Sequence, residues 1–213
     1  MTRPQFFLAL AAAVVAALAA VIGGIIAVRG SHRQSPAVAP PPGPYRGSEP
    51  PGGIVAGSFR LRSYRGHTVS MRAERGKVVL LSFVDTKCTE SCPIVASAMA
   101  QAYRLLPPDE RQQVVPLLIS VEPRADTPAR VQRFLTGRRA LALDYLIGSV
   151  KELRPVWKAY AILPAVDTGN ADVHSSDVRV IDRHGIWVAT QHAGVDLTSK
   201  NLAHDALEAL TRP

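Results

Sequence analysis

The run KVVLLSFVD, residues 77–85, constrains the fold more than any other stretch of the chain. Nearly every side chain in it is apolar, which is typical of a β-strand covered on both faces and therefore of an α/β fold. The segment CTESC that follows holds both cysteines of the chain, Cys88 and Cys92, and Pro93 comes directly after them. Pro93 fits the first turn of a helix, which we expect to continue through IVASAMAQAYRLL.

The rest of this region also alternates between strands and helices. Apolar runs predict buried strands at VVPLLISVE and LDYLIG, and hairpins are expected around Arg65-Gly66 and Arg183-His184-Gly185. Thr127-Pro128 and the capping box of Ser149 and Glu152 each mark the start of a helix, and TSKNLAHDALEAL predicts an amphipathic closing helix. Ligands of open α/β sheets gather at the carboxyl ends of strands, which is where both cysteines lie.

The N-terminal part has a different character. Phe6 to Val28 carries no charge, and a helix of that length spans the ~30 Å hydrocarbon core of a bilayer. No small-residue cleavage site follows, which favours a retained anchor over a cleaved signal peptide. We therefore expect a membrane anchor over residues 1–29, a proline-rich linker over 30–53 and one α/β domain over 54–213. Arginines flank the apolar run on both sides, so charge gives no orientation.

The net charge of +8 does not indicate a nucleic-acid partner. Basic and acidic residues alternate along the domain, whereas nucleic-acid binding calls for a basic stripe or patch. A solvated positive surface is the simplest interpretation, and contact with an acidic partner or with lipid head groups is the alternative.

Three interpretations of the two thiols remain open at this point. A structural disulfide would close a very small loop and contribute little stability. A redox pair is the second interpretation, because a helix N-terminus lowers the pKa of a nearby thiol, and Cys92 lies nearest to it. Against this interpretation, the usual redox motif has two residues between its cysteines rather than three. A metal site is the third interpretation, because two thiolates suit copper(I), and zinc is also compatible with two cysteines and a histidine.

A third ligand for such a site would be a histidine. His32 lies in the linker, and His67, His184 and His204 are expected at the surface. His192 ends a strand and is ambiguous. His174 precedes a strand at the end of a polar loop that could fold over the cysteines.

Three segments resemble the Sco/SenC family of copper chaperones. VVLLSFVDTKCTESCP is similar to that family's buried strand followed by Cys-x-x-x-Cys-Pro, and SVEPRADTPARVQRFL is similar to its Ser-Val-Asp-Pro-x-x-Asp-Thr-Pro. VHSSDVRVIDRHG is similar to its Asp-His-Ser…Ile-Asp-x-x-Gly. Order and spacing agree, and together the segments cover about Phe59 to Leu210.

The resemblance implies a thioredoxin-like three-layer α/β/α sandwich with a mixed central sheet, preceded by one N-terminal transmembrane helix. It implies that Cys88, Cys92 and His174 are copper ligands and that the domain lies outside the cytoplasm. Family members help to load the binuclear copper centre of cytochrome c oxidase subunit II, so that subunit or another cuproprotein is the implied partner. Some act as thiol-disulfide reductases, which makes Cys88 and Cys92 a redox-active pair in the alternative function.

The absence of an Arg-rich presequence favours a bacterial plasma membrane over mitochondria.

The chain departs from the family pattern in places. Glu122 replaces the first aspartate of the acidic motif, Val173 replaces the aspartate before the histidine, and Val-Asp-Thr-Lys precedes Cys88 in place of an aromatic-rich segment. No proline precedes the strand after residue 176, which argues against a general thioredoxin. Glu122 and Asp126 either stabilise the start of the following helix or take part directly in copper transfer.

Overall fold

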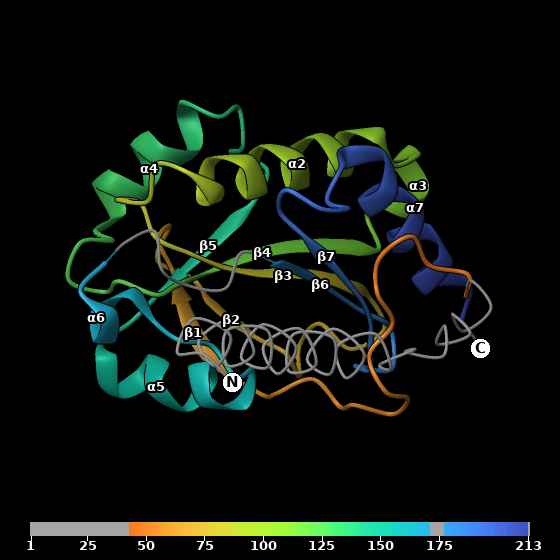
Figure 1. The fold of residues 1–213 in the computed structure, drawn as a ribbon, viewed down its shortest axis with the longest axis horizontal. Helices are drawn as coiled ribbons and strands as arrows, with labels where there is room; N and C mark the ends of the chain where they lie inside the picture. The colour runs from red at the N-terminus through yellow and green to blue at the C-terminus, as the bar shows by residue number, and fades with distance from the viewer. Residues whose placement is uncertain (1–42, 171–176, 213) are drawn as a thin grey trace, which may run out of the picture. The chain divides into compact units, whose positions relative to one another are not determined.

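The computed structural model describes residues 43–170 and 177–212. Seven strands form one mixed sheet in the order β2-β1-β5-β4-β3-β6-β7 (Figure 1). The strands are β1 (Arg60–Ser63), β2 (Thr68–Ser70), β3 (Val78–Val84), β4 (Val114–Ser120), β5 (Asp144–Ile147), β6 (Asp177–Ile181) and β7 (Trp187–His192). Strands β3, β4 and β5 run parallel, and the other neighbouring pairs are antiparallel.

Strand β3 lies near the middle of the sheet, as its sequence predicts. It pairs with β4 on one side and β6 on the other, and all seven of its residues are buried. Leu80 and Val84 face one hydrophobic core, and Leu81 and Phe83 face the other. A polar side chain breaks the run at Ser82, whose hydroxyl donates to the carbonyl of Asp177 at 2.6 Å.

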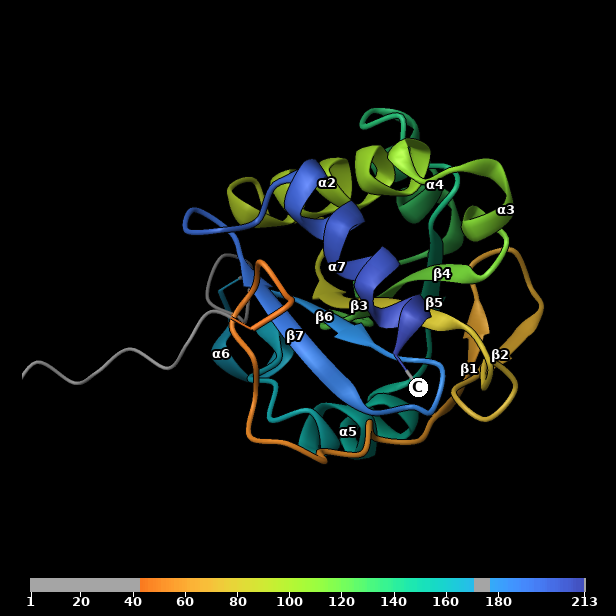
Figure 2. The same cartoon turned by 90° about the vertical axis from the view of Figure 1, so that its right-hand side faces the viewer.

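Helices cover both faces of the sheet (Figures 1 and 2). One face packs against side chains of α2, α4 and α7, and the other packs against α5 and the short α6. The helices are α2 (Ser91–Leu105), α3 (Pro108–Arg111), α4 (Pro128–Thr136), α5 (Val150–Ala159), α6 (Ala165–Thr168) and α7 (Ser199–Thr211). The expected α/β/α layers and mixed sheet are therefore confirmed.

The helix starts follow the local signals in the sequence. Pro93 lies in the first turn of α2, the Thr127 side chain accepts from the Arg130 amide at the start of α4, and Ser149 and Glu152 form the complete capping box of α5. The short helices α3 and α6 were not expected.

Residues 43–57, here called the N-terminal strap, are held by hydrogen bonds to the edge of the sheet. Ser48 and Thr190 of β7 exchange two backbone hydrogen bonds of 2.9 Å. The buried carboxylate of Asp205 on α7 accepts from the amides of Arg46 at 2.7 Å and Gly47 at 3.0 Å. The proline content places residues 43–53 in the linker, but these contacts join them to the domain, and the compact unit runs from Pro42 to Pro213.

In the part of the chain that the structure describes, no helix combines the length and apolar character needed to cross a membrane. The anchor predicted over residues 1–29 lies outside the described residues, as does the first part of the predicted linker.

Replacing Asp205 with alanine should release the strap. The Arg46 and Gly47 amides and the Gln191 side chain, which donates to the same carboxylate at 2.6 Å, would lose their acceptor. Hydrogen bonds to a charged acceptor typically contribute about 1.5–3 kcal/mol each, and the released strap amides would bond to water, so we expect a loss of about 2–4 kcal/mol in the free energy of unfolding by urea. Trypsin should also cleave after Arg46 faster than in the parent protein.

Glu208→Ala on the same helix is the matched control, since Glu208 is half-buried and makes no contact with the strap amides. Equal cleavage rates in parent and Asp205→Ala proteins would show that the strap does not depend on this carboxylate.

Candidate functional site

The two cysteines lie together at the carboxyl end of β3. Cys88 is in the turn that leaves the strand, and Cys92 is the second residue of α2. Both are buried, with 2% of Cys88 and none of Cys92 exposed. The turn brings the sulfurs close because the Cys92 amide donates to Cys88 Sγ at 3.3 Å.

Each sulfur has a further polar neighbour. The Asp85 amide donates to Cys92 Sγ at 3.4 Å, and the Ser91 hydroxyl lies 3.7 Å from Cys88 Sγ. A hydrogen bond with the Cys88 side chain and burial hold the pKa of the Cys92 thiol far above its ordinary value. The expectation that the helix N-terminus lowers the pKa of Cys92 is therefore wrong, since the sulfur lies inside the core, where a negative charge is costly.

Asp85 is a buried carboxyl beside the thiol pair. Its Oδ1 accepts from the Lys87 amide at 2.6 Å, whereas its Oδ2 has no hydrogen-bond partner within the described residues. Burial raises its pKa from 3.8 to about 6, and the nearby Asp126 carboxyl adds to the shift. The sequence contains a signal for this residue, because it is a carboxyl at the end of an apolar strand and three positions before a cysteine.

Asp126 joins three strands around the cysteine turn. Its Oδ1 accepts from the Thr86 amide at 3.0 Å and from the Thr86 hydroxyl at 2.6 Å. Its Oδ2 accepts from the hydroxyls of Ser120 on β4 and Tyr145 on β5, both at 2.6 Å. The Asp126 side chain is therefore not the helix cap, which is Thr127, and it fixes the residues that lead into Cys88.

Glu122 shapes the loop after β4. Its Oε1 accepts from the Arg124 amide at 3.3 Å, and its Oε2 lies 3.8 Å from Lys87 Nζ. Lys87 is half-exposed, so this ion pair is weak, yet it places an opposite charge beside the lysine that precedes Cys88.

His174 lies outside the described residues, so its imidazole is not placed relative to the sulfurs. Three histidines of the described residues pair with carboxylates: His67 with Asp144 at 2.7 Å, His192 with Asp196 at 3.8 Å, and His204 with Asp205 at 3.2 Å. Across residues 43–170 and 177–212, no group of three or more histidine, cysteine or acidic side chains could hold a metal ion. Cys88 and Cys92 are thus brought together, and the third predicted ligand stays a prediction.

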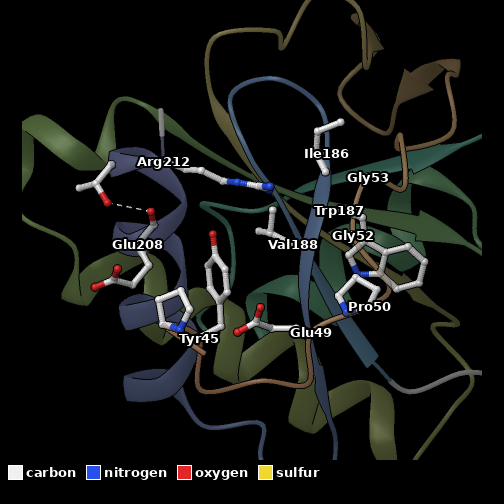
Figure 3. A pocket seen from close by; sticks show the side chains of 12 residues that line it. Tyr45, Glu49, Pro50, Gly52, Gly53, Ile186, Trp187, Val188, Glu208 and Arg212 are labelled. Atoms are coloured by element: carbon white, nitrogen blue, oxygen red, sulfur yellow. Dashed lines mark hydrogen bonds between the residues drawn. The ribbon is translucent and has the colours of Figure 1, made fainter. Parts of the chain in front are cut away.

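A separate hollow of about 330 Å³ lies between the strap, β7 and α7 (Figure 3). Its side chains include Tyr45, Glu49, Trp187 and Arg212, and neither cysteine lines it. No thiol chemistry can therefore take place in this hollow.

Asp85→Asn should change how stability of the metal-free protein depends on pH. The folded state binds the Asp85 proton more tightly than the unfolded state, so this contribution favours folding at low pH. It is lost as the pH rises from about 4 to about 6. We expect the asparagine variant to gain stability relative to the parent across that window, measured by urea unfolding at pH 4 to 8.

Asp109→Asn, at an exposed position on α3, is the control. A difference between Asp85→Asn and parent that stays constant with pH would contradict the elevated pKa.

Asp126→Ala should destabilise the protein and loosen the cysteine turn. Thr86, Ser120 and Tyr145 would all lose a buried acceptor, and we expect a cost of about 3–5 kcal/mol. Asp126→Asn, which keeps one oxygen acceptor, should cost less. The two thiols should react faster in the alanine variant with a disulfide reagent that releases a coloured product. An unchanged rate would show that Asp126 does not hold the cysteine turn in place.

Comparison with known proteins adds relatives of this arrangement. A putative copper-binding protein of Stutzerimonas stutzeri is 30% identical over 115 residues, which cover 52% of this chain and 56% of that protein. The chain thus spans little more than half the length of this relative. The copper-bound structure of Bradyrhizobium japonicum ScoI is 25% identical, with a TM-score of 0.62 over 73% of this chain and 99% of that one.

Two further structures support the fold alone. BsSco, described as a Sco-family cytochrome c oxidase assembly protein with a disulfide switch, is 23% identical, with a TM-score of 0.64 over 78% of this chain and 99% of its own. The thioredoxin domain of a thiol-disulfide oxidoreductase from Bacteroides vulgatus is 15% identical, with a TM-score of 0.57 over 75% and 97%. The fold is therefore thioredoxin-like. The SCO1/SenC family matches residues 48–209, a range that includes the strand, the turn and both cysteines, and this chain belongs to that family.

Proposed function

We propose that this chain is a copper chaperone that binds copper through Cys88, Cys92 and His174. The observation that carries the proposal is the pair of adjacent sulfurs on one strand-to-helix turn, each of which accepts a backbone amide hydrogen bond. Thiolate sulfur is the ligand that copper(I) prefers, and amide donors stabilise the negative charge that a thiolate carries. The copper-binding relative and the copper-bound ScoI structure support the choice of this metal.

The described residues on either side of His174 support it as the third ligand. Asp177, three positions after His174, is held at Ser82 near the carboxyl end of β3. On the other side, the Val166 amide of α6 donates to the carbonyl of Val121, which follows β4. Both anchors lie at the end of the sheet that carries the cysteines. Three residues span up to about 10 Å, which is enough to reach a neighbouring turn.

The recipient in this proposal is cytochrome c oxidase subunit II, at its binuclear copper centre. BsSco, a relative of the same fold, is described as a member of a family of cytochrome c oxidase assembly proteins. Transfer by ligand exchange suits the site, because ligands of the recipient can replace the imidazole first and the two sulfurs afterwards. Other cuproproteins with thiolate or imidazole ligands could receive copper in the same way.

We also propose that residues 1–29 tether the protein to a bacterial plasma membrane with the domain on the extracytoplasmic side. The uncharged run Phe6 to Val28 supports the tether. A tether would hold the copper site near a membrane-bound recipient and raise its effective concentration there.

A thiol-disulfide reductase is the second candidate function. The short turn between the cysteines favours it, since the Cys92 amide lies only 3.3 Å from Cys88 Sγ and two sulfurs held on one turn can form a disulfide with little rearrangement. One thiolate would attack a disulfide of the partner, and the second would displace the mixed disulfide, leaving Cys88–Cys92 oxidised and the partner reduced.

Copper binding by the reduced protein tests the main proposal. Cys88→Ser and Cys92→Ser should each weaken copper(I) binding by at least about 100-fold, and His174→Ala should weaken it while leaving both thiols reactive. Because copper must displace a proton held tightly by the thiol pair, affinity should rise about tenfold per pH unit for each proton released. The measurement is competition with a chromophoric copper(I) chelator at pH 6 to 8.

His184→Ala, at an exposed turn, is the matched control and should bind as the parent does. Unchanged affinity in both cysteine variants would exclude the site. If His174→Ala retained parental copper affinity and only disulfide exchange depended on the cysteines, the reductase would be the better function.

A further inference from the structure

The segment from Thr127 to Leu143 is strongly basic. It contains Arg130, Arg133, Arg138 and Arg139 and no aspartate or glutamate. Along the sequence these charges form no continuous run, but α4 and the turn after it gather three of them in one place.

Three of these arginines line a pocket of about 420 Å³, here called the arginine pocket. The pocket is lined by Arg130, Arg133 and Arg138 together with Thr86 and Phe134. Thr86 lies two residues before Cys88 and is held by Asp126. The start of α2 and helix α4 also lie at the same end of the sheet (Figure 1). The arginine pocket therefore adjoins the turn that carries the cysteines.

Within residues 43–170 and 177–212, no acidic side chain neutralises these guanidinium groups. Among the ion pairs of the described residues, none includes Arg130, Arg133 or Arg138. Arg138 lies 4.0 Å over the Phe134 ring and donates to the Phe134 carbonyl at 2.9 Å, which fixes its plane. Its Nε is buried and, within the described residues, has no hydrogen-bond partner.

The pocket and the thiols also interact electrostatically. Burial lowers the pKa of Arg138, and negative charge on Cys92 or Cys88, once a thiolate forms there, acts in the opposite direction. Since that interaction is mutual, a negative charge near the sulfurs is stabilised by the same guanidinium.

We propose that the arginine pocket is the docking site for carboxylate side chains of the protein that exchanges metal or thiols with Cys88 and Cys92. The proposal rests on the function proposed above and identifies the surface chemistry of the recipient. Guanidinium groups bind carboxylates through paired hydrogen bonds, and the planar Arg138 is already oriented by Phe134.

A protein fits this position better than a free anion. Any recipient of metal from the buried sulfurs must approach the turn from Thr86 to Cys92, and the pocket forms part of that approach. Acidic side chains on the recipient would be steered to the turn before exchange begins, with a rate that falls as salt screens the charges.

Binding of an acidic peptide to the full-length chain tests the proposal. The probe is fluorescein-labelled hexaglutamate, followed by fluorescence anisotropy at 50 and 300 mM NaCl. Arg130→Gln/Arg133→Gln should weaken binding about tenfold at low salt, and high salt should reduce the difference. Both side chains reach solvent, so the double variant should fold, which urea unfolding checks.

Arg60→Gln/Arg62→Gln is the matched control, because it removes the same charge from two exposed positions on β1 that do not line the pocket. Its affinity should change less than about twofold. Equal losses in the two double variants would overturn the proposal, because binding would then follow net charge alone.

Two further measurements separate the alternatives. Citrate is used to compete with the labelled peptide. If citrate binds more tightly than the peptide, compared at equal carboxylate concentration, the assignment to a protein partner is overturned. Copper(I) affinity of Arg130→Gln/Arg133→Gln should match the parent, and a loss would overturn the docking role by placing the arginines in the copper site. Failure of the proposed chaperone function would give a different result. The cysteine variants would then keep the parental copper affinity, and the peptide would still bind.

Discussion

The carboxylate of Asp126 is the interaction on which the rest of the site depends. It is buried, and it accepts hydrogen bonds from three residues. These are Thr86, which lies two positions after β3, Ser120 on β4 and Tyr145 on β5. These partners come from three separate segments that meet only in the folded sheet. Among the described residues the Thr86 amide has no other acceptor, so this carboxylate helps to fix the position of the turn into Cys88. Burial raises the pKa of the Asp126 carboxyl, and the four hydrogen bonds offset only part of that shift.

The thiol pair that this turn presents is buried, and the Cys92 thiol keeps its proton in the absence of metal. A charged thiolate in the core is costly, which keeps the pKa of Cys92 high, yet amide donors at both sulfurs are ready to stabilise negative charge. A soft metal ion that displaces the protons therefore meets a site already shaped for thiolate ligands. The unpartnered Oδ2 of Asp85 lies among the same groups, so proton release there and at the thiols is coupled.

The sequence predicted what depends on local signals and missed what depends on distant contacts. The apolar run of β3, the Ser149–Glu152 capping box and the cysteine turn all follow from neighbours in the chain. The prolines of residues 43–53 predict an extended linker. The acceptor of the strap amides, Asp205, lies about 160 positions away and gives no local signal. Asp126 looked like part of a helix start for the same reason, since its partners Thr86 and Tyr145 lie 40 and 19 positions away.

The charged side chains around the cysteine turn come from different elements than the two sulfurs. Lys87, the cation nearest to Cys88 in sequence, faces Glu122, so the cysteine turn itself contributes little net positive charge. The arginines of the arginine pocket form no ion pair with another described residue, and they lie on α4 and the turn after it, elements that contribute no metal ligand in the proposed site. Substitutions on α4 can thus alter which protein docks without disturbing the thiols, and substitutions in the turn can alter metal affinity without changing the docking charge. Because Asp126 connects the two regions through Thr86, their relative position stays fixed while their chemistry varies.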